Sequence, residues 1–297
     1  MSTVTETVQD RTDYAHPEVL VSTDWVLEHH ADPGVKLVEV DVDTQAYHAG
    51  HIPGAVGLDW EKELQDQTRR DIAGKAQLEK LLGERGISRD DTIVLYGDHS
   101  NWFAAYAFWL FKTYGHEDVR LMNGGRNKWL DEDDKPLTTD APQITPTTYA
   151  ADEPNAGLRA KLGEILALAE GGQGALLVDV RSPDEFAGRV VAPPGLKETA
   201  QRAGHIPGAK SVPWATAVAE DGTFKPFPEL KKIYVEGESI APGEPVIAYC
   251  RIGERSSHTW FVLKYLLGFE NVRNYDGSWT EYGSIVGAPI ENPSAAE

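Results

Sequence analysis

Cysteine is nearly absent from this chain, since Cys250 is the single one among 297 residues. A lone cysteine excludes an intrachain disulfide, and it excludes a disulfide exchange that needs a resolving thiol on the same chain. Long apolar runs are absent too: no uninterrupted stretch approaches membrane-spanning length, and residues 1–11 lack the apolar core of a secretory signal. These absences predict a cytoplasmic protein with no membrane partner.

Positive charge is scarce, with 28 Lys and Arg against 47 Asp and Glu and a formal net charge of −19. Such a surface would repel the phosphates of nucleic acid, which is therefore not an expected partner. The histidines show no spacing typical of metal ligands, and the glycine-rich turn at 171–174 lacks the lysine of a phosphate loop. The sequence therefore predicts neither a metal nor another cofactor.

What the chain does contain is one long internal repeat. Three pairs of segments match each other: 37–41 with 177–181, 51–55 with 205–209, and 96–119 with 249–272. The second copy is longer between Arg181 and His205, where residues 188–203 are expected to form a surface loop. Duplication of one domain explains this pattern far better than chance.

Each copy has the signals of strands that alternate with helices. Short apolar runs predict strands at 36–41, 92–97, 175–180 and 245–249. Amphipathic runs predict helices near 75–85, 102–114, 158–170, 228–236 and 257–267. The fold class is therefore α/β, with two tandem domains that each hold a mainly parallel sheet covered by helices on both faces. We expect the first domain over 1–140, a linker rich in Pro and Thr over 141–154, and the second domain over 155–297.

The most reactive residue lies where one predicted strand ends. The apolar run 245–249 leads into Cys250, a short loop follows, and an amphipathic run over 257–267 ends at Gly268. A sulfur in this place faces loop N–H groups and the positive end of a helix dipole, which favour a thiolate. The residues expected to cradle it are Ile252, Gly253, Glu254 and Ser256. In the first copy Gly97 stands opposite Cys250, so only the second copy is expected to react.

These motifs together resemble the two-domain rhodanese family of sulfurtransferases. The likeness covers nearly the whole chain, and its elements are the paired His-Ile-Pro-Gly-Ala turns, Leu-Val-Asp-Val-Arg at 177–181, Tyr-Cys-Arg-Ile-Gly-Glu-Arg at 249–255 and Tyr-Asp-Gly-Ser-Trp at 275–279. The loop is most similar to that of actinobacterial thiosulfate sulfurtransferases. The resemblance implies two rhodanese-like domains, the first without the cysteine and the second catalytic.

The resemblance also implies residue roles. Cys250 is the expected sulfur carrier, which cycles through a persulfide, and Arg181 and Arg251 are the expected substrate-binding residues. Where vertebrate thiosulfate enzymes carry a lysine two residues after the cysteine, this chain has Ile252, and Arg255 is expected to supply the missing charge. Because no second thiol exists, the persulfide must pass its sulfur to an external acceptor such as cyanide, a thiol or an acceptor protein.

Several alternatives stay open at this point. The sulfur donor is expected to be thiosulfate, with 3-mercaptopyruvate as the alternative, and a non-catalytic module for sulfur delivery or binding is the competing class. A cysteine phosphatase fits poorly, because its arginine follows the cysteine after five residues, whereas Ser256 holds that position here. The imidazoles of His51 and His205 recur in both copies, so a turn-stabilising role is expected for them.

Overall fold

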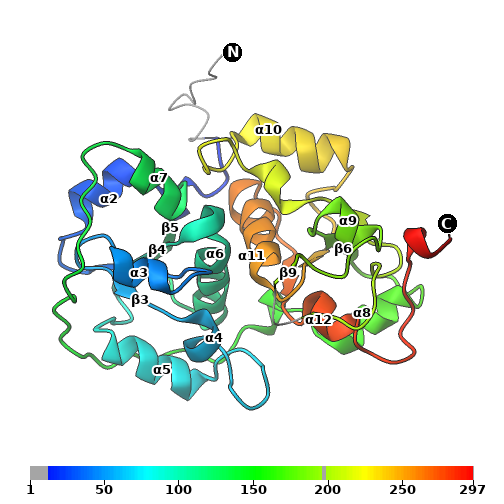
Figure 1. Ribbon diagram of the computed structural model, residues 1–297, viewed down its shortest axis with the longest axis horizontal. Helices are drawn as coiled ribbons and strands as arrows, with labels where there is room; N and C mark the ends of the chain where they lie inside the picture. The colour runs from blue at the N-terminus through cyan, green and yellow to red at the C-terminus, as the bar shows by residue number, and fades with distance from the viewer. Residues whose placement is uncertain (1–12, 196–198, 297) are drawn as a thin grey trace. The chain divides into compact units, whose positions relative to one another are not determined.

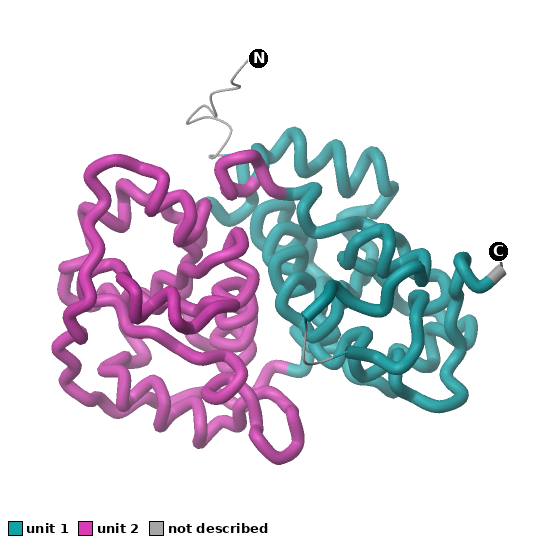
Figure 2. The backbone as a smooth tube through the Cα atoms, viewed as in Figure 1, with its two compact units in different colours: residues 1–17, 156–217, 225–297 teal, residues 18–155, 218–224 magenta. Residues whose placement is uncertain are grey.

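The computed structural model describes residues 13–195 and 199–296, which form two compact units (Figure 2). One unit comprises residues 18–155 together with 218–224, and the other comprises the remaining described residues. This grouping differs from the predicted boundaries in three places, the first being that the predicted linker 141–154 falls inside the first unit. Residues 13–17 belong to the second unit, and residues 218–224, from the second copy of the repeat, belong to the first.

The first unit is built on five parallel strands in the order β1-β5-β4-β2-β3. The strands are β1 (Leu20–Val21), β2 (Val35–Glu39), β3 (Val56–Gly57), β4 (Thr92–Tyr96) and β5 (Val119–Met122). Its helices are α2 (Thr23–His29), α3 (Gln45–Ala49), α4 (Trp60–Glu63), α5 (Lys75–Glu84), α6 (Asp98–Thr113) and α7 (Gly125–Asp131), and a 3₁₀ turn, η1 (Pro17–Val19), precedes β1 (Figure 1).

The second unit repeats this sheet with four parallel strands in the order β7-β6-β8-β9, formed by β6 (Leu176–Asp179), β7 (Lys210–Ser211), β8 (Val246–Tyr249) and β9 (Val272–Tyr275). Its α-helices are α8 (Leu162–Ala169), α9 (Pro183–Phe186), α10 (Phe227–Lys231), α11 (Glu254–Phe261) and α12 (Ser278–Tyr282). The π turns η4 (Lys232–Gly237) and η5 (Val262–Leu266) extend α10 and α11, and the 3₁₀ turns are η2 (Ala156–Leu158), η3 (Trp214–Ala217) and η6 (Pro293–Ala296). The predicted α/β class is confirmed.

Strand β8 is the central feature of the second unit. All four of its residues are buried, because neighbouring strands pair with both of its edges and helices cover the sheet. Helix α11 packs back against β8 and β9. The chain therefore turns from the end of a buried strand directly into a helix, and Cys250 lies at that turn.

The segment predicted as a linker is fastened to the first unit. The Thr147 N–H donates to the Gly83 carbonyl at 2.9 Å, and the Tyr149 hydroxyl lies 2.8 Å from Nδ1 of His116. Further along, the Asp152 N–H donates to the Tyr114 carbonyl at 3.1 Å. These bonds satisfy the backbone of an extended stretch that has no helix or strand of its own.

The repeated histidines stabilise turns, as the sequence predicts. Nδ1 of His51 lies 2.9 Å from the Tyr47 carbonyl, and Nδ1 of His205 lies 2.7 Å from the Phe186 carbonyl. Each imidazole also stacks on the ring of that same aromatic residue. The same contacts in the copy without a cysteine show that they belong to the scaffold.

Candidate active site

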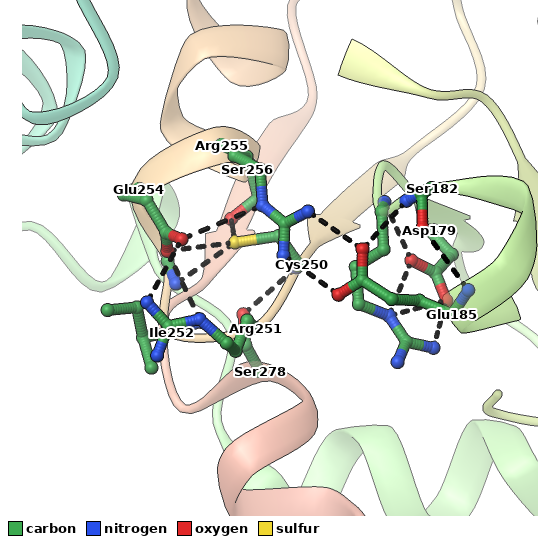
Figure 3. Close-up of polar contacts among 12 residues, drawn as sticks. Asp179, Ser182, Glu185, Cys250, Arg251, Ile252, Glu254, Arg255, Ser256 and Ser278 are labelled. Atoms are coloured by element: carbon green, nitrogen blue, oxygen red, sulfur yellow. Dashed lines mark hydrogen bonds and ion pairs between the residues drawn. The ribbon is translucent and has the colours of Figure 1, made fainter. Parts of the chain in front are cut away.

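The loop after β8 places the sulfur of Cys250 under backbone N–H groups. The Gly253 N–H donates to Sγ at 3.2 Å, and the Cys250 N–H donates to the Ser278 hydroxyl at 3.0 Å (Figure 3). Gly253 has φ +104°, and a Cβ there would lie 2.9 Å from Asp276, so the turn requires glycine. Helix α11 begins at Glu254, earlier than the amphipathic pattern over 257–267 predicts.

A carboxylate touches the sulfur. Glu254 is 2% exposed, and its Oε2 lies 3.2 Å from Sγ of Cys250 and accepts the Ile252 N–H at 3.3 Å. In this contact the Cys250 thiol donates and the carboxylate oxygen accepts. The Glu254 side chain therefore points into the loop that was expected to hold an anion.

The hydroxyl of Ser256 lies close to the sulfur as well, 3.6 Å from Sγ. Its single proton is directed to Oδ1 of Asn274 at 2.6 Å, and the Asn274 amide in turn donates to the Ser257 hydroxyl at 2.9 Å. The shorter contact determines where the proton lies, so Ser256 holds the loop against β9 and is at most a weak donor to sulfur.

The three expected substrate-binding arginines all lie beside carboxylates. Arg181 is fully buried, and its guanidinium donates to both oxygens of Asp179 and to the Gly204 carbonyl. Arg255 makes a two-point pair with Glu185 at 2.9 and 3.1 Å. Each of these guanidinium charges is thus compensated by a buried carboxylate.

Arg251 and Arg255 both approach the Glu254 carboxylate. Nη2 of Arg251 lies 3.7 Å from Oε1 of Glu254, and Nε of Arg255 approaches the same oxygen at 3.6 Å. Three arginines therefore face three carboxylates around the loop. The side chains give this site little net positive charge, so backbone N–H groups and the start of α11 remain the main features that attract an anion.

The pKa of Cys250 shifts in the direction opposite to the predicted one. Burial, and then the neighbouring Glu254 carboxylate, raises the pKa of the Cys250 thiol, although Arg255 acts against this. The sequence argument counted the arginines and the helix terminus as free positive charge. It did not include the carboxylates that pair with the arginines, nor the complete burial of the sulfur.

Two carboxylates near the loop were missed by the sequence argument. Asp179 lies at the end of β6, and Glu185 lies in α9, where it completes a capping box with Ser182. Although burial alone would raise it, the pairing with Arg255 lowers the pKa of Glu185. The motif Ser-Pro-Asp-Glu at 182–185 is a capping-box signal and could have indicated a helix start here, but not the partner of its glutamate.

The matching loop of the first copy closes without a thiol. Asn101, which aligns with Glu254, accepts the Gly97 N–H at 3.0 Å and donates to the Met122 carbonyl at 2.7 Å. Residues 99–101 all have positive φ values, between 44° and 69°. A neutral amide therefore closes this loop from the position that a carboxylate occupies in the second copy.

The charges beneath the two loops are also rearranged. In the second copy the Asp179 carboxylate pairs with Arg181 two residues later. In the first copy Glu39 pairs with Arg126, which comes from α7, and Asp41 takes the position of Arg181. Burial, and then the neighbouring Glu39, raises the pKa of Asp41 to about 9.

We expect Asp41→Asn to stabilise the protein at alkaline pH. Folded Asp41 keeps its proton up to about pH 9 while the unfolded chain loses it near 3.8, so stability present at low pH is lost across that interval. The loss reaches about 1.4 kcal/mol per pH unit, and asparagine removes it. Urea unfolding at about pH 5 and about pH 8 should show a gain that grows with pH. The exposed Asp133→Asn serves as the control, and a pH-independent gain for Asp41→Asn would refute the assignment.

Two further features of the described residues bear on function. They contain no helix long and apolar enough to cross a membrane. Within residues 13–195 and 199–296, no group of three or more His, Cys, Asp or Glu side chains is arranged to hold a metal ion.

Comparison with known proteins settles the family. A profile of the Rhodanese-like domain matches the chain twice, over residues 22–132 and 162–284. The chain belongs to the rhodanese family. The predicted resemblance and the two-domain rhodanese fold are therefore confirmed, with Cys250 in the second of the two domains.

Individual relatives of this rhodanese match along most of their length. It is 58% identical over 277 residues to "Putative thiosulfate sulfurtransferase" of Saccharopolyspora erythraea, which covers 93% of this chain and 97% of that relative. It is 54% identical over 281 residues to "Sulfur carrier protein TtuD" of Thermus thermophilus, covering 93% and 98%. The structure of SseA from Escherichia coli, described among 3-mercaptopyruvate sulfotransferases, is 29% identical with a TM-score of 0.73, covering 88% of this chain and 98% of SseA.

Proposed function

We propose that this rhodanese is a sulfurtransferase that moves sulfane sulfur from thiosulfate to an external acceptor through a persulfide on Cys250. The observation that supports this most is the position of the lone thiol. Its Sγ lies at the end of a buried strand and accepts the Gly253 N–H, in the loop that leads into α11. The names of its relatives, which include a thiosulfate sulfurtransferase and a sulfur carrier, agree with this chemistry.

The proposed reaction has two displacements. The Cys250 thiolate attacks the outer sulfur of thiosulfate, the sulfur–sulfur bond of the donor breaks, and sulfite leaves with the bonding electron pair. Cyanide or a thiolate then attacks the outer sulfur of the persulfide, and the Cys250 thiolate departs. The extra sulfur of the persulfide is proposed to lie in a cradle formed by the loop backbone at Ile252, Gly253, Glu254 and Ser256. Because Cys250 is fully buried, the donor must displace covering groups to reach it.

Among the arginines, Arg251 is the best candidate to bind the anionic group of the donor. It follows Cys250 directly in the loop, and its guanidinium lies beside the Glu254 carboxylate that touches the sulfur. For Arg181 and Arg255 we propose a supporting role, in which they hold carboxylates near the loop and limit the negative charge that a donor meets.

Another sulfur donor and another kind of sulfur acceptor are the alternatives to this proposal. SseA is described among 3-mercaptopyruvate sulfotransferases, so 3-mercaptopyruvate is the alternative donor. The relative named as a sulfur carrier favours an acceptor that is a protein, in which case the chain would deliver sulfur to that protein and not to cyanide.

Turnover with each donor tests the proposal. Wild-type protein is incubated with cyanide and either thiosulfate or 3-mercaptopyruvate, and thiocyanate is measured. The proposal expects faster turnover with thiosulfate. A preference for 3-mercaptopyruvate would change the donor, and no thiocyanate from either, with no persulfide formed, would leave the binding module as the function.

The role of Arg251 has its own test. If its guanidinium binds the sulfonate end of thiosulfate, Arg251→Ala should raise KM about tenfold or more with a smaller change in kcat, as expected for a lost ion contact. Arg273→Ala, which removes a guanidinium that pairs with Glu164 near the surface, is the matched control. An unchanged KM in folded Arg251→Ala would remove the assignment.

A further inference from the structure

We propose that the Glu254 carboxylate is the group that takes the proton from the Cys250 thiol. This inference rests on the proposed sulfur transfer, which requires a thiolate. The geometry is direct, because Oε2 of Glu254 lies 3.2 Å from Sγ, within reach of a proton transfer without an intervening water (Figure 3). The buried thiol has no other carboxylate at hydrogen-bonding distance among the described residues.

The groups around Glu254 hold its carboxylate in this position. Oε2 also accepts the Ile252 N–H, and Oε1 lies within 3.7 Å of Arg251 and 3.6 Å of Arg255. These contacts leave the oxygen nearest to sulfur with one N–H donor and the thiol. The carboxylate is therefore fixed toward the sulfur by its own ion pairs.

The other titratable groups near the pair are engaged or neutral. Glu185 of α9 pairs with Arg255, and Asp276, after β9, pairs with Arg159. Burial lowers the pKa of His258 in α11 to about 3, so its ring is neutral near neutral pH. Among the described residues, the Cys250 thiol is therefore the proton donor that lies against Oε2 of Glu254.

The duplicated domain shows that loop closure does not require this carboxylate. Asn101 holds the corresponding place in the first copy and closes its loop through amide hydrogen bonds to Gly97 and Met122. A carboxylate buried beside a thiol is costly, and a neutral residue at this position can serve the structure. At this aligned position, an acidic residue is therefore present only in the copy that carries the nucleophilic cysteine.

The proton and the electrons balance through the cycle. The thiol proton moves from Sγ to Oε2, giving a thiolate and a neutral carboxylic acid while the total charge of the pair stays the same. The thiolate attacks the outer sulfur of thiosulfate, sulfite leaves, and a persulfide anion remains beside the protonated Glu254. After the acceptor takes the outer sulfur, the Cys250 thiolate recovers its proton from Glu254.

Glu254→Gln tests the proposal, because glutamine keeps the size and the amide that the first copy uses but cannot take a proton. Two rates are measured from about pH 6 to about pH 9: single-turnover persulfide formation with thiosulfate, and alkylation of Cys250 by iodoacetamide without any donor. In the wild type both should change little with pH, since the proton is passed internally. In Glu254→Gln both should fall about 100-fold at the acidic end and rise about tenfold per pH unit.

Glu254→Asp, which keeps the acid but shortens it, should restore the flat pH profile at a reduced rate. A loss that is equal at every pH in Glu254→Gln would indicate a merely structural role and overturn the proposal. So would a faster reaction at every pH, which would mean that the carboxylate only repels the thiolate. If the wild type forms no persulfide while alkylation still shows the predicted profiles, the sulfur transfer fails and the role of Glu254 stands.

Discussion

Cys250→Ser is expected to abolish thiocyanate formation, with kcat/KM reduced at least about 10³-fold. The hydroxyl that replaces the thiol cannot form a persulfide and so cannot carry the sulfur. No second cysteine exists to take over. Turnover with thiosulfate and cyanide is the measurement, made on variants whose urea unfolding matches that of the wild type.

The serine variant should remain folded, since the contacts of Sγ are few. The Cys250 N–H bond to Ser278 involves the backbone and survives the substitution. Residual turnover above about one-hundredth of the wild-type rate would show that sulfur moves without a covalent intermediate on Cys250. In that case the site would bind the two substrates together and transfer sulfur directly.

Glu185→Ala should be strongly destabilising, by about 3–5 kcal/mol, because it leaves the Arg255 guanidinium buried without its bidentate partner. Glu185 is fully buried, and it accepts from both terminal nitrogens of Arg255 and from the N–H of Ser182, the N-cap of α9. The free energy of unfolding is measured in urea. Glu185→Gln, which keeps the helix cap, should cost less than alanine.

The control for this prediction is a pair of the same two residue types at the surface. Glu164 and Arg273 also form two hydrogen bonds, at 2.5 and 2.6 Å, but both side chains are partly exposed. Glu164→Ala should cost at most about 1 kcal/mol, since solvent screens such pairs. If the two alanine variants lost equal stability, the Arg255–Glu185 pair would not be the structural support that its burial indicates.

The architecture was largely predictable because it depends on local patterns. Apolar runs that end in permissive loops indicated β2, β4, β6 and β8, and the repeated His-Ile-Pro-Gly-Ala turns indicated the duplication. Short elements such as α9 and α12 were missed, because four or five residues carry too little periodicity to be recognised.

The electrostatics of the site were not predictable in the same way. A pattern of residues shows that Arg251 and Arg255 flank the cysteine, but not which carboxylates reach them. Glu185 is 70 positions away from Arg255 in sequence, and only the fold brings the two together. The sequence likewise does not show whether the Glu254 side chain points toward the sulfur or away from it, because that depends on where α11 begins. The direction of the Cys250 pKa followed from these contacts and was therefore predicted wrongly.

Intact mass of the full chain after exposure to thiosulfate tests the central claim most directly. The protein should gain one sulfur atom, about 32 Da, and lose it again when cyanide is added, while Cys250→Ser should gain nothing. Persistence of the unmodified mass with both thiosulfate and 3-mercaptopyruvate, in protein whose Cys250 can still be alkylated, would contradict the account.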